Sequence, residues 1–305
     1  MTGTGAYIFP SQVVLDEQLR RDCLESRIMR PLLDLASDTL STDLRTILAE
    51  GTDDEVNDPR VRRPVISLVA VAGYQEEQRL RPFTPTCVAG ISLGALSAAT
   101  AVGWLSLEEM VRVSHLMASI ELEEFAGTDQ RSVFFYNCDH ETAFAALRED
   151  GVDDLLHLSV IVSSNQFLAG CRRSDLPRIV PSLARVGALF KVVPYSYPGH
   201  CDLMGDVQKR FADAWHPVDP LANLTIPMVG ITDCRPYTSA EGVRRILIEQ
   251  YTTVMDWRGV LTYLEKLELD HCVVLRPADF VLKSISLDPH CGLDARMGGI
   301  GSDLG

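Results

Sequence analysis

Short apolar runs in the first 126 residues alternate with segments whose apolar residues recur at helical spacing. The runs at 6–9, which Pro10 ends, and at 86–90 predict two short buried strands. The second run leads directly into a segment of small residues, 93–103, which predicts a helix that ends at Gly103.

Two longer helices are predicted on either side of this unit. In the segment 64–80 apolar residues recur at helical spacing, and Pro64 suits a first helical turn. In the segment 106–125, Ser106 and Glu109 have the spacing of a capping box, and an apolar face follows them.

From residue 127 to 196 the segments become shorter and follow the order strand, helix, strand, helix, strand. This alternation indicates a small α+β unit inserted into an α/β chain. Further on, a strand is predicted at 224–232 and one long amphipathic helix at 243–267. We therefore expect residues 1–126 and 197–305 to form one subdomain and residues 127–196 a second, smaller one.

The composition narrows the class of protein. The chain has 305 residues, 46% of them hydrophobic, enough for one large core or a core with a small subdomain. A net charge of -14 argues against nucleic acid or an anionic membrane as the main partner. Since no apolar run reaches the roughly 20 residues of a membrane span and the N-terminus does not look like a signal peptide, we expect a cytoplasmic protein. The eight cysteines are scattered without metal-type spacing, so we expect reduced structural thiols and no metal site.

The stretch "CVAGISLGALSAAT" contains Ser92 in a G-x-S-x-G pattern, between a predicted strand and a predicted helix. Such a turn lifts the serine hydroxyl clear of the backbone and points the helix N-terminus at a developing oxyanion. The serine needs a base, and the sequence offers seven histidines. We favour His200, because it follows Pro198 and Gly199 in a loop, where catalytic side chains are common.

Five segments, in order, resemble the malonyl-CoA:acyl carrier protein transacylases and the acyltransferase domains of polyketide synthases. They are "YIFPSQ", "GISLGALSAATAVGWLSLEEMVRV", "SSNQFLAG", "PYSYPGHCDLM" and "IPMVGITDCRPYTSAEGVRRILIEQYTTVMDW". Each match alone is modest. Five in the family's order, over nearly the whole chain, are specific.

The resemblance implies an α/β-hydrolase-like large subdomain with an inserted ferredoxin-like small subdomain. It also implies ping-pong acyl transfer by Ser92 and His200, with Gln12 and the backbone amide of Leu93 at the oxyanion site. The implied substrates are an acyl thioester and an acyl carrier protein, which itself carries the phosphopantetheine. No bound cofactor is expected, and we expect a monomer.

The chain departs from the family where the acyl group is recognised. Malonyl-transferring members have an arginine that binds the acyl carboxylate, and Met117 stands at that position here. Gly199 replaces a larger residue before the histidine, and Ile91 stands where the family usually has histidine beside the serine. Met117 and Gly199 predict a pocket for a larger acyl group without a terminal carboxylate, such as an aminoacyl or dipeptidyl starter unit in polyketide or antibiotic biosynthesis. Ile91 is assigned to the same acyl pocket.

Because acyl carrier proteins are usually acidic, docking on this acidic chain needs a local basic patch. Candidates are Arg172, Arg173, Lys209, Arg210 and Arg296. Other functions remain open at this point: a malonyl-CoA:acyl carrier protein transacylase, an editing hydrolase that releases acyl groups to water, and a non-catalytic module that binds carrier proteins. An esterase with a Ser-Asp-His triad would use His271.

Overall fold

Two β-sheets organise the chain in the computed structural model, which describes residues 4–194, 196–217, 223–277, 279–286, 288 and 290–300. The first sheet has the strand order β11-β10-β1-β2-β7-β8, parallel from β11 to β7 and antiparallel between β7 and β8. Its strands are β1 (Gly5–Phe9), β2 (Cys87–Gly90), β7 (Met228–Val229), β8 (Pro236–Tyr237), β10 (His271–Leu275) and β11 (Arg296–Gly298).

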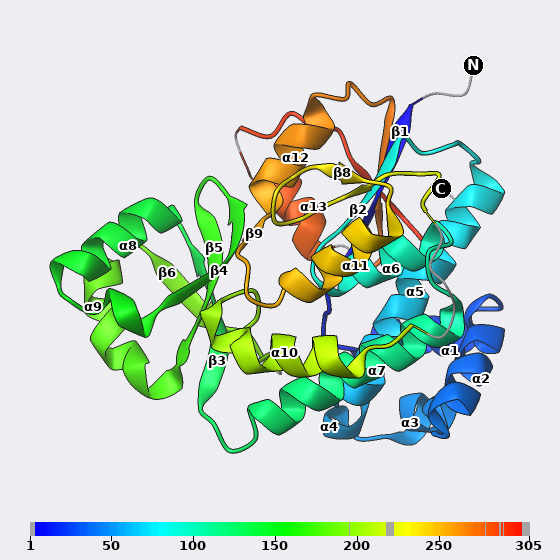
Figure 1. Cartoon of the computed structure of the whole chain (residues 1–305), viewed down its shortest axis with the longest axis horizontal. Helices are drawn as coiled ribbons and strands as arrows, with labels where there is room; N and C mark the ends of the chain where they lie inside the picture. Colours follow the sequence, from blue (N-terminus) through cyan, green and yellow to red (C-terminus); the bar gives the residue numbers. More distant parts are fainter. Residues whose placement is uncertain are drawn as a thin grey trace.

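Helices cover both faces of this sheet (Figure 1). Alternate residues of β1 point to opposite faces, so Tyr7 and Phe9 join one hydrophobic cluster while Ala6 and Ile8 join another. The helices of this part of the chain are α1 (Glu17–Glu25), α2 (Met29–Leu40), α3 (Leu44–Glu50), α4 (Asp53–Val56), α5 (Pro59–Leu80), α6 (Leu93–Ala101), α7 (Leu107–Glu124), α10 (Gly205–Ala214), α11 (Ala240–Glu249), α12 (Trp257–Glu265) and α13 (Asp279–Ser286).

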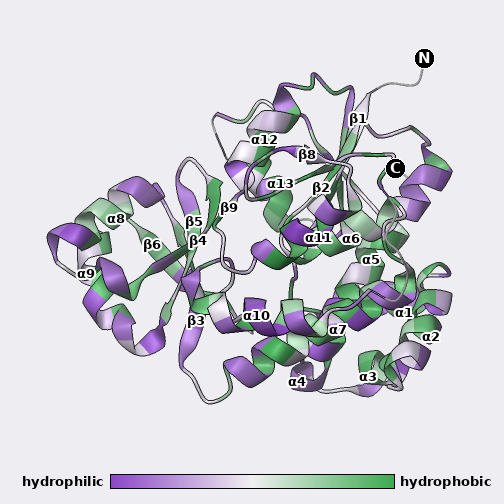
Figure 2. Cartoon of the chain, viewed as in Figure 1, coloured by the Kyte–Doolittle hydropathy of each residue, from purple (hydrophilic) through white to green (hydrophobic). Residues whose placement is uncertain are grey.

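The second sheet has the order β6-β3-β5-β4-β9 and lies to one side of the first, at the left of Figure 1. Two helices pack on it, and their outer turns are hydrophilic (Figure 2). Its elements are β3 (Gln130–Tyr136), α8 (His140–Glu149), β4 (His157–Ser163), β5 (Gln166–Arg172), α9 (Leu176–Arg185), β6 (Leu189–Val192) and β9 (Met255–Asp256), with the short 3-10 turns η1 (Asp153–Leu155), η2 (Arg173–Asp175) and η3 (Asp202–Met204). Since β9 comes from the C-terminal part of the chain, this sheet is not formed by 127–196 alone. The subdomain boundaries given above stay a prediction.

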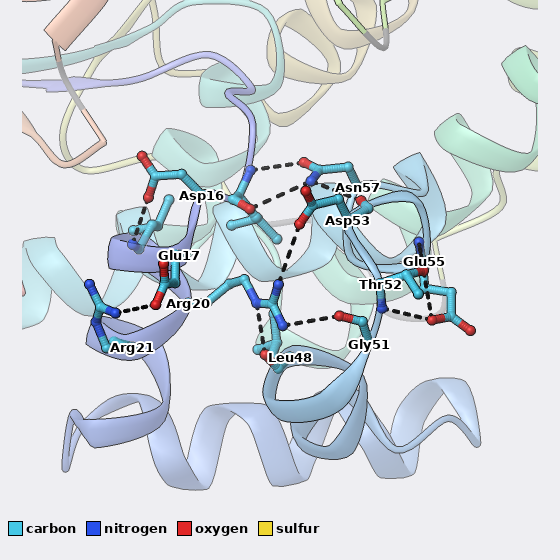
Figure 3. A network of polar contacts seen from close by, with 12 residues as sticks. Asp16, Glu17, Arg20, Arg21, Leu48, Gly51, Thr52, Asp53, Glu55 and Asn57 are labelled. Atoms are coloured by element: carbon cyan, nitrogen blue, oxygen red, sulfur yellow. Dashed lines mark hydrogen bonds and ion pairs between the residues drawn. The ribbon is translucent and has the colours of Figure 1, made fainter.

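A polar network ties the chain after β1 to the helices α1, α3 and α4 (Figure 3). The backbone N–H of Leu15 donates to Asn57 Oδ1 at 2.9 Å, which ties the segment to the end of α4. Arg20 of α1 donates to the carbonyls of Leu48, at 2.9 Å, and Gly51, at 3.1 Å. The first of these hydrogen bonds holds Leu15 at the end of α4, and the other two hold α1 against α3.

Two predictions about helices were wrong. Helix α5 begins at Pro59, so Pro64 lies inside it and not in its first turn. A proline there removes the hydrogen bond to the carbonyl four residues earlier, and the imidazole Nδ1 of His115 lies 3.1 Å from that carbonyl, Arg60 O. The expected single helix over 243–267 is two helices, because the Asp256 side chain accepts from Gly259 N and starts α12 after the strand β9.

The N-terminus of α7 matches its prediction in part. The Ser106 side chain accepts from the backbone N–H of Glu109, as a capping residue does. The Glu109 carboxylate accepts a hydrogen bond from Trp215 Nε1, at 3.1 Å, and so links α7 to the end of α10.

Candidate active site

Ser92 occupies a sharp turn between β2 and α6, with φ 55° and ψ -115°. This positive φ is unfavourable for a residue with a side chain, and such strained turns are common at functional sites. A Cβ on Gly90 would lie 2.2 Å from the backbone of Gly94, and one on Gly94 would lie 2.3 Å from Phe9 O. Both glycines of G-x-S-x-G are therefore required by close backbone approach, which is the physical reason for the motif.

The imidazole of His200 lies within hydrogen-bond distance of the Ser92 hydroxyl. Its Nε2 lies 2.8 Å from Ser92 Oγ, and its Nδ1 lies 2.6 Å from the backbone carbonyl of Gln250. Because a carbonyl only accepts, Nδ1 carries the proton and Nε2 is left to accept the serine proton. Burial lowers the pKa of His200, while the hydrogen bond to Gln250 acts in the opposite direction. The imidazole is thus neutral at pH 7, the form that a general base needs.

Gln250 was not predicted from the sequence. It caps the C-terminus of α11, where the last carbonyls of a helix have no partner within the helix. A backbone carbonyl can be supplied by any residue, so no side-chain signal marks it.

The two residues predicted at the oxyanion site, Leu93 and Gln12, line the same cavity as Ser92. Leu93 is the first residue of α6, so its backbone N–H has no helical carbonyl to reach. Gln12 lines the same cavity as Ser92 and His200. Its Oε1 accepts from Arg62 Nη2 and Arg63 Nε, each at 3.2 Å, so the side-chain oxygen is held by two guanidiniums.

A cavity of about 340 Å³ opens beside Ser92 between the two sheets. Ile91, Met117 and Gly199, the residues assigned to an acyl pocket above, all line this cavity, and their role in binding an acyl group stays a prediction. Met117 is 7% exposed, and a Cβ built at Gly199 would have no described atom within 4 Å other than those of its own residue and chain neighbours. Part of its apolar wall comes from the second sheet and α13: Phe134, Val160, Leu168, Phe280 and Val281.

A buried ion pair in this cavity escaped the sequence analysis. Arg63 Nη1 donates to Glu121 Oε1 at 2.8 Å, and Arg63 Nη2 donates to Glu121 Oε2. Both side chains are about nine-tenths buried and line the cavity. The two residues are 58 positions apart on α5 and α7, and no local pattern links them.

An esterase-type triad with His271 is inconsistent with the sheet. Ser92 follows the carboxyl end of β2, whereas His271 begins β10, and both strands run parallel to β1. His271 therefore lies at the amino-terminal end of the parallel strands, whereas Ser92 lies at their carboxyl end. The His271 side chain is exposed and lies next to the Phe83 ring.

The five docking candidates are spread over different elements. Arg172 and Arg173 are exposed at the end of β5, and Lys209 is exposed on α10. Arg210 binds Glu123 and Glu124 of α7, and Arg296 of β11 lies 2.7 Å from Glu77. Carboxylates of the chain itself thus partly neutralise the last two.

The described ranges contain no group of histidine, cysteine or carboxylate side chains that could hold a metal ion. Within the same residues, no helix is long and apolar enough to cross a membrane. All eight cysteines are free thiols, and six of them are buried.

Comparisons with known proteins indicate which class of enzyme this two-sheet α/β chain is similar to. No protein-family model matches the chain. Among curated proteins, the malonyl CoA-acyl carrier protein transacylase of Bacillus subtilis is 24% identical over 278 residues, which cover 85% of this chain and 65% of the relative. The transacylase of Escherichia coli K12 is 22% identical, over 89% of this chain and 88% of its own length. The polyketide biosynthesis protein ThaF of Burkholderia thailandensis is 26% identical over 76% of this chain but only 20% of its own length.

The solved structures to which the chain is similar include malonyl transacylases as well. A chain from the complex of a type II polyketide synthase acyl carrier protein with its malonyl-transacylase superposes with a TM-score of 0.85 and 20% identity, covering 96% of this chain and 95% of that one. The Coxiella burnetii transacylase has the same TM-score with 19% identity, and the match covers 97% and 94% of the two chains. These neighbours confirm the predicted fold, an α/β-hydrolase-like large subdomain with a ferredoxin-like small subdomain. The resemblance to malonyl-CoA:acyl carrier protein transacylases, predicted from five segments, is likewise confirmed.

Proposed function

We propose that the chain is an acyltransferase that moves an acyl group without a terminal carboxylate from a thioester donor to an acyl carrier protein. The observation that carries the chemistry is the 2.8 Å contact between His200 Nε2 and Ser92 Oγ at the strained turn. The similarity to transacylases along most of the chain supports the acyltransferase class and the carrier-protein partner.

In the first half-reaction His200 Nε2 takes the proton of Ser92 Oγ as the oxygen attacks the thioester carbonyl carbon. The Leu93 amide, with the segment around Gln12, faces the oxyanion that forms. The carbon–sulfur bond then breaks, and His200 returns its proton to the leaving sulfur. In the second half-reaction the acceptor thiol gives its proton to His200 as its sulfur attacks the acyl-serine carbonyl carbon. The bond from that carbon to Ser92 Oγ then breaks, and His200 returns the proton to Ser92 Oγ.

The acyl group is inferred from the wall of the cavity. Met117 gives an uncharged surface where malonyl-transferring enzymes place an arginine, and the open space at Gly199 leaves room for a larger acyl chain. An aminoacyl or dipeptidyl starter unit in a polyketide pathway fits these features. The similarity to a polyketide biosynthesis protein supports that pathway class. The phosphopantetheine belongs to the partner, and this chain needs no cofactor for the two half-reactions.

Malonyl transfer is the main alternative, since most of the similar proteins carry that name. Hydrolysis of the acyl-serine is another. The test mixes the protein with a donor carrier protein that carries an aminoacyl group and an acceptor carrier protein that carries none. The mass of each carrier protein is then followed over time by mass spectrometry. The proposal expects Ser92-dependent gain of the acyl mass on the acceptor. Release of free acid at the same rate with and without the acceptor would instead identify a hydrolase.

A further inference from the structure

Arg63 and Glu121 form a closed pair at the wall of the acyl cavity. Each terminal nitrogen of the Arg63 guanidinium donates to a different oxygen of Glu121, so the carboxylate occupies the whole fork of the arginine. The third side of the guanidinium, Nε, donates to Gln12 Oε1 at 3.2 Å. A protein carboxylate thus occupies the position on Arg63 that a carboxylate of the substrate would take.

The pair is placed by helix geometry. Glu121 follows Met117 by four residues on α7, so both side chains lie on the same face, and both line the cavity. Arg63 reaches them from α5, which packs along α7 (Figure 1). The cavity therefore has an apolar residue and then a carboxylate on successive turns of α7.

We propose that Glu121 determines acyl specificity by excluding acyl groups that end in a carboxylate. The inference rests on the proposed function and deepens it. Loss of the family's arginine alone leaves another guanidinium, that of Arg63, in the wall of the cavity that Ser92 lines, and a free guanidinium there would bind malonyl groups. Glu121 neutralises that guanidinium and repels a second carboxylate at close range. Uncharged and amino-terminated acyl groups meet no such repulsion.

Two other cations line the cavity and are arranged differently. Arg62 donates to Gln12 and is 2% exposed, and Lys191 is exposed on the edge strand β6. Both oxygens of the Glu121 carboxylate accept hydrogen bonds from Arg63. Arg63 is therefore the cation that replacement of Glu121 would leave without its carboxylate partner, and its free guanidinium should then bind malonyl groups.

The experiment measures equilibrium binding in a Ser92→Ala background, so that it needs no acyl transfer. The probes are pantetheine amides of malonic and butyric acid, in which nitrogen replaces the thioester sulfur. Glu121→Gln should tighten malonyl binding at least about tenfold and leave butyryl binding within about twofold. Adding Arg63→Gln should remove the gain. Glu123→Gln, an exposed carboxylate on the same helix, is the matched control and should change neither affinity.

A second pair of variants keeps Glu121 in place in case its replacement unfolds the protein. Met117→Arg adds a guanidinium that Glu121 cannot also neutralise, so malonyl should bind at least about tenfold more tightly. Arg63→Gln/Met117→Arg restores one guanidinium for one carboxylate and should lose that gain.

Two results would overturn the proposal. The first is a folded Glu121→Gln protein that binds the butyryl probe but binds the malonyl probe no more tightly than its parent. The second is a gain in malonyl affinity, from Glu121→Gln or from Met117→Arg, that persists when Arg63→Gln is added. Failure of the butyryl probe to bind any variant would instead refute the proposed function, and the inference with it.

Discussion

Substitution of Gly94 by alanine tests whether the turn at Ser92 depends on close backbone contact. A Cβ at this position would lie 2.3 Å from Phe9 O and 2.6 Å from Pro10 O, whereas such contacts essentially never fall below 3.0 Å. Strand β1 or the start of α6 must therefore move by roughly 0.7 Å. Both carry groups of the site, since Leu93 begins α6 and Gln12 follows β1.

A displacement of this size should reduce the rate of Ser92 acylation about 100-fold, because misplacement by about 1 Å can cost that much in a positioned reaction. Overpacking should also lower the free energy of unfolding by about 1–3 kcal/mol. The assay is single-turnover acylation by an acyl thioester, followed by mass spectrometry, with urea unfolding on the same samples. Gly205→Ala is the control, because a Cβ there has no described atom within 4 Å and lies at the start of α10. Wild-type acylation and stability in Gly94→Ala protein would refute the steric explanation of the motif.

Three further predictions concern the base, the pocket and the partner. Burial lowers the pKa of His200, so the imidazole stays neutral to a lower pH than an ordinary histidine does. The acylation rate should therefore decline only below about pH 6.5. A decline centred above that pH would contradict the burial argument. Gly199→Val should slow loading of aminoacyl and longer groups about tenfold or more while sparing acetyl, measured as kcat/KM for each thioester, and a uniform loss would count against a pocket role. If the end of β5 is part of the docking surface, Arg172→Glu should slow acyl transfer from a carrier protein but not from a small thioester. The control is Arg112→Glu, at an exposed position of α7. Equal effects of Arg172→Glu on both donors would exclude docking at the end of β5.

The sequence was informative wherever a structural feature is encoded locally. Strand β1, strand β2 and helix α6 were predicted because an apolar run, a proline or a glycine marks each end within a few residues. The turn at Ser92 was predicted for the same reason, since both glycines act within two residues of the serine.

Features that depend on distant contacts were missed. The break between α11 and α12 lies in a stretch of continuous helical periodicity, and it is stabilised by β9 pairing with β4, almost a hundred residues earlier in the chain. Likewise, Arg63 and Glu121 each look like ordinary helix-surface charges until α5 and α7 pack together. The hydrogen bond from His200 to Gln250 uses a backbone carbonyl, which every sequence supplies.

Intact-protein mass spectrometry after incubation with a panel of acyl thioesters tests the central claim most directly. The panel holds malonyl, acetyl, aminoacyl and longer acyl groups, with Ser92→Ala protein as the control. The account predicts a Ser92-dependent mass adduct from the larger groups without a terminal carboxylate and little or none from malonyl. A prominent malonyl adduct on Ser92 would contradict it and would identify an ordinary malonyl transacylase.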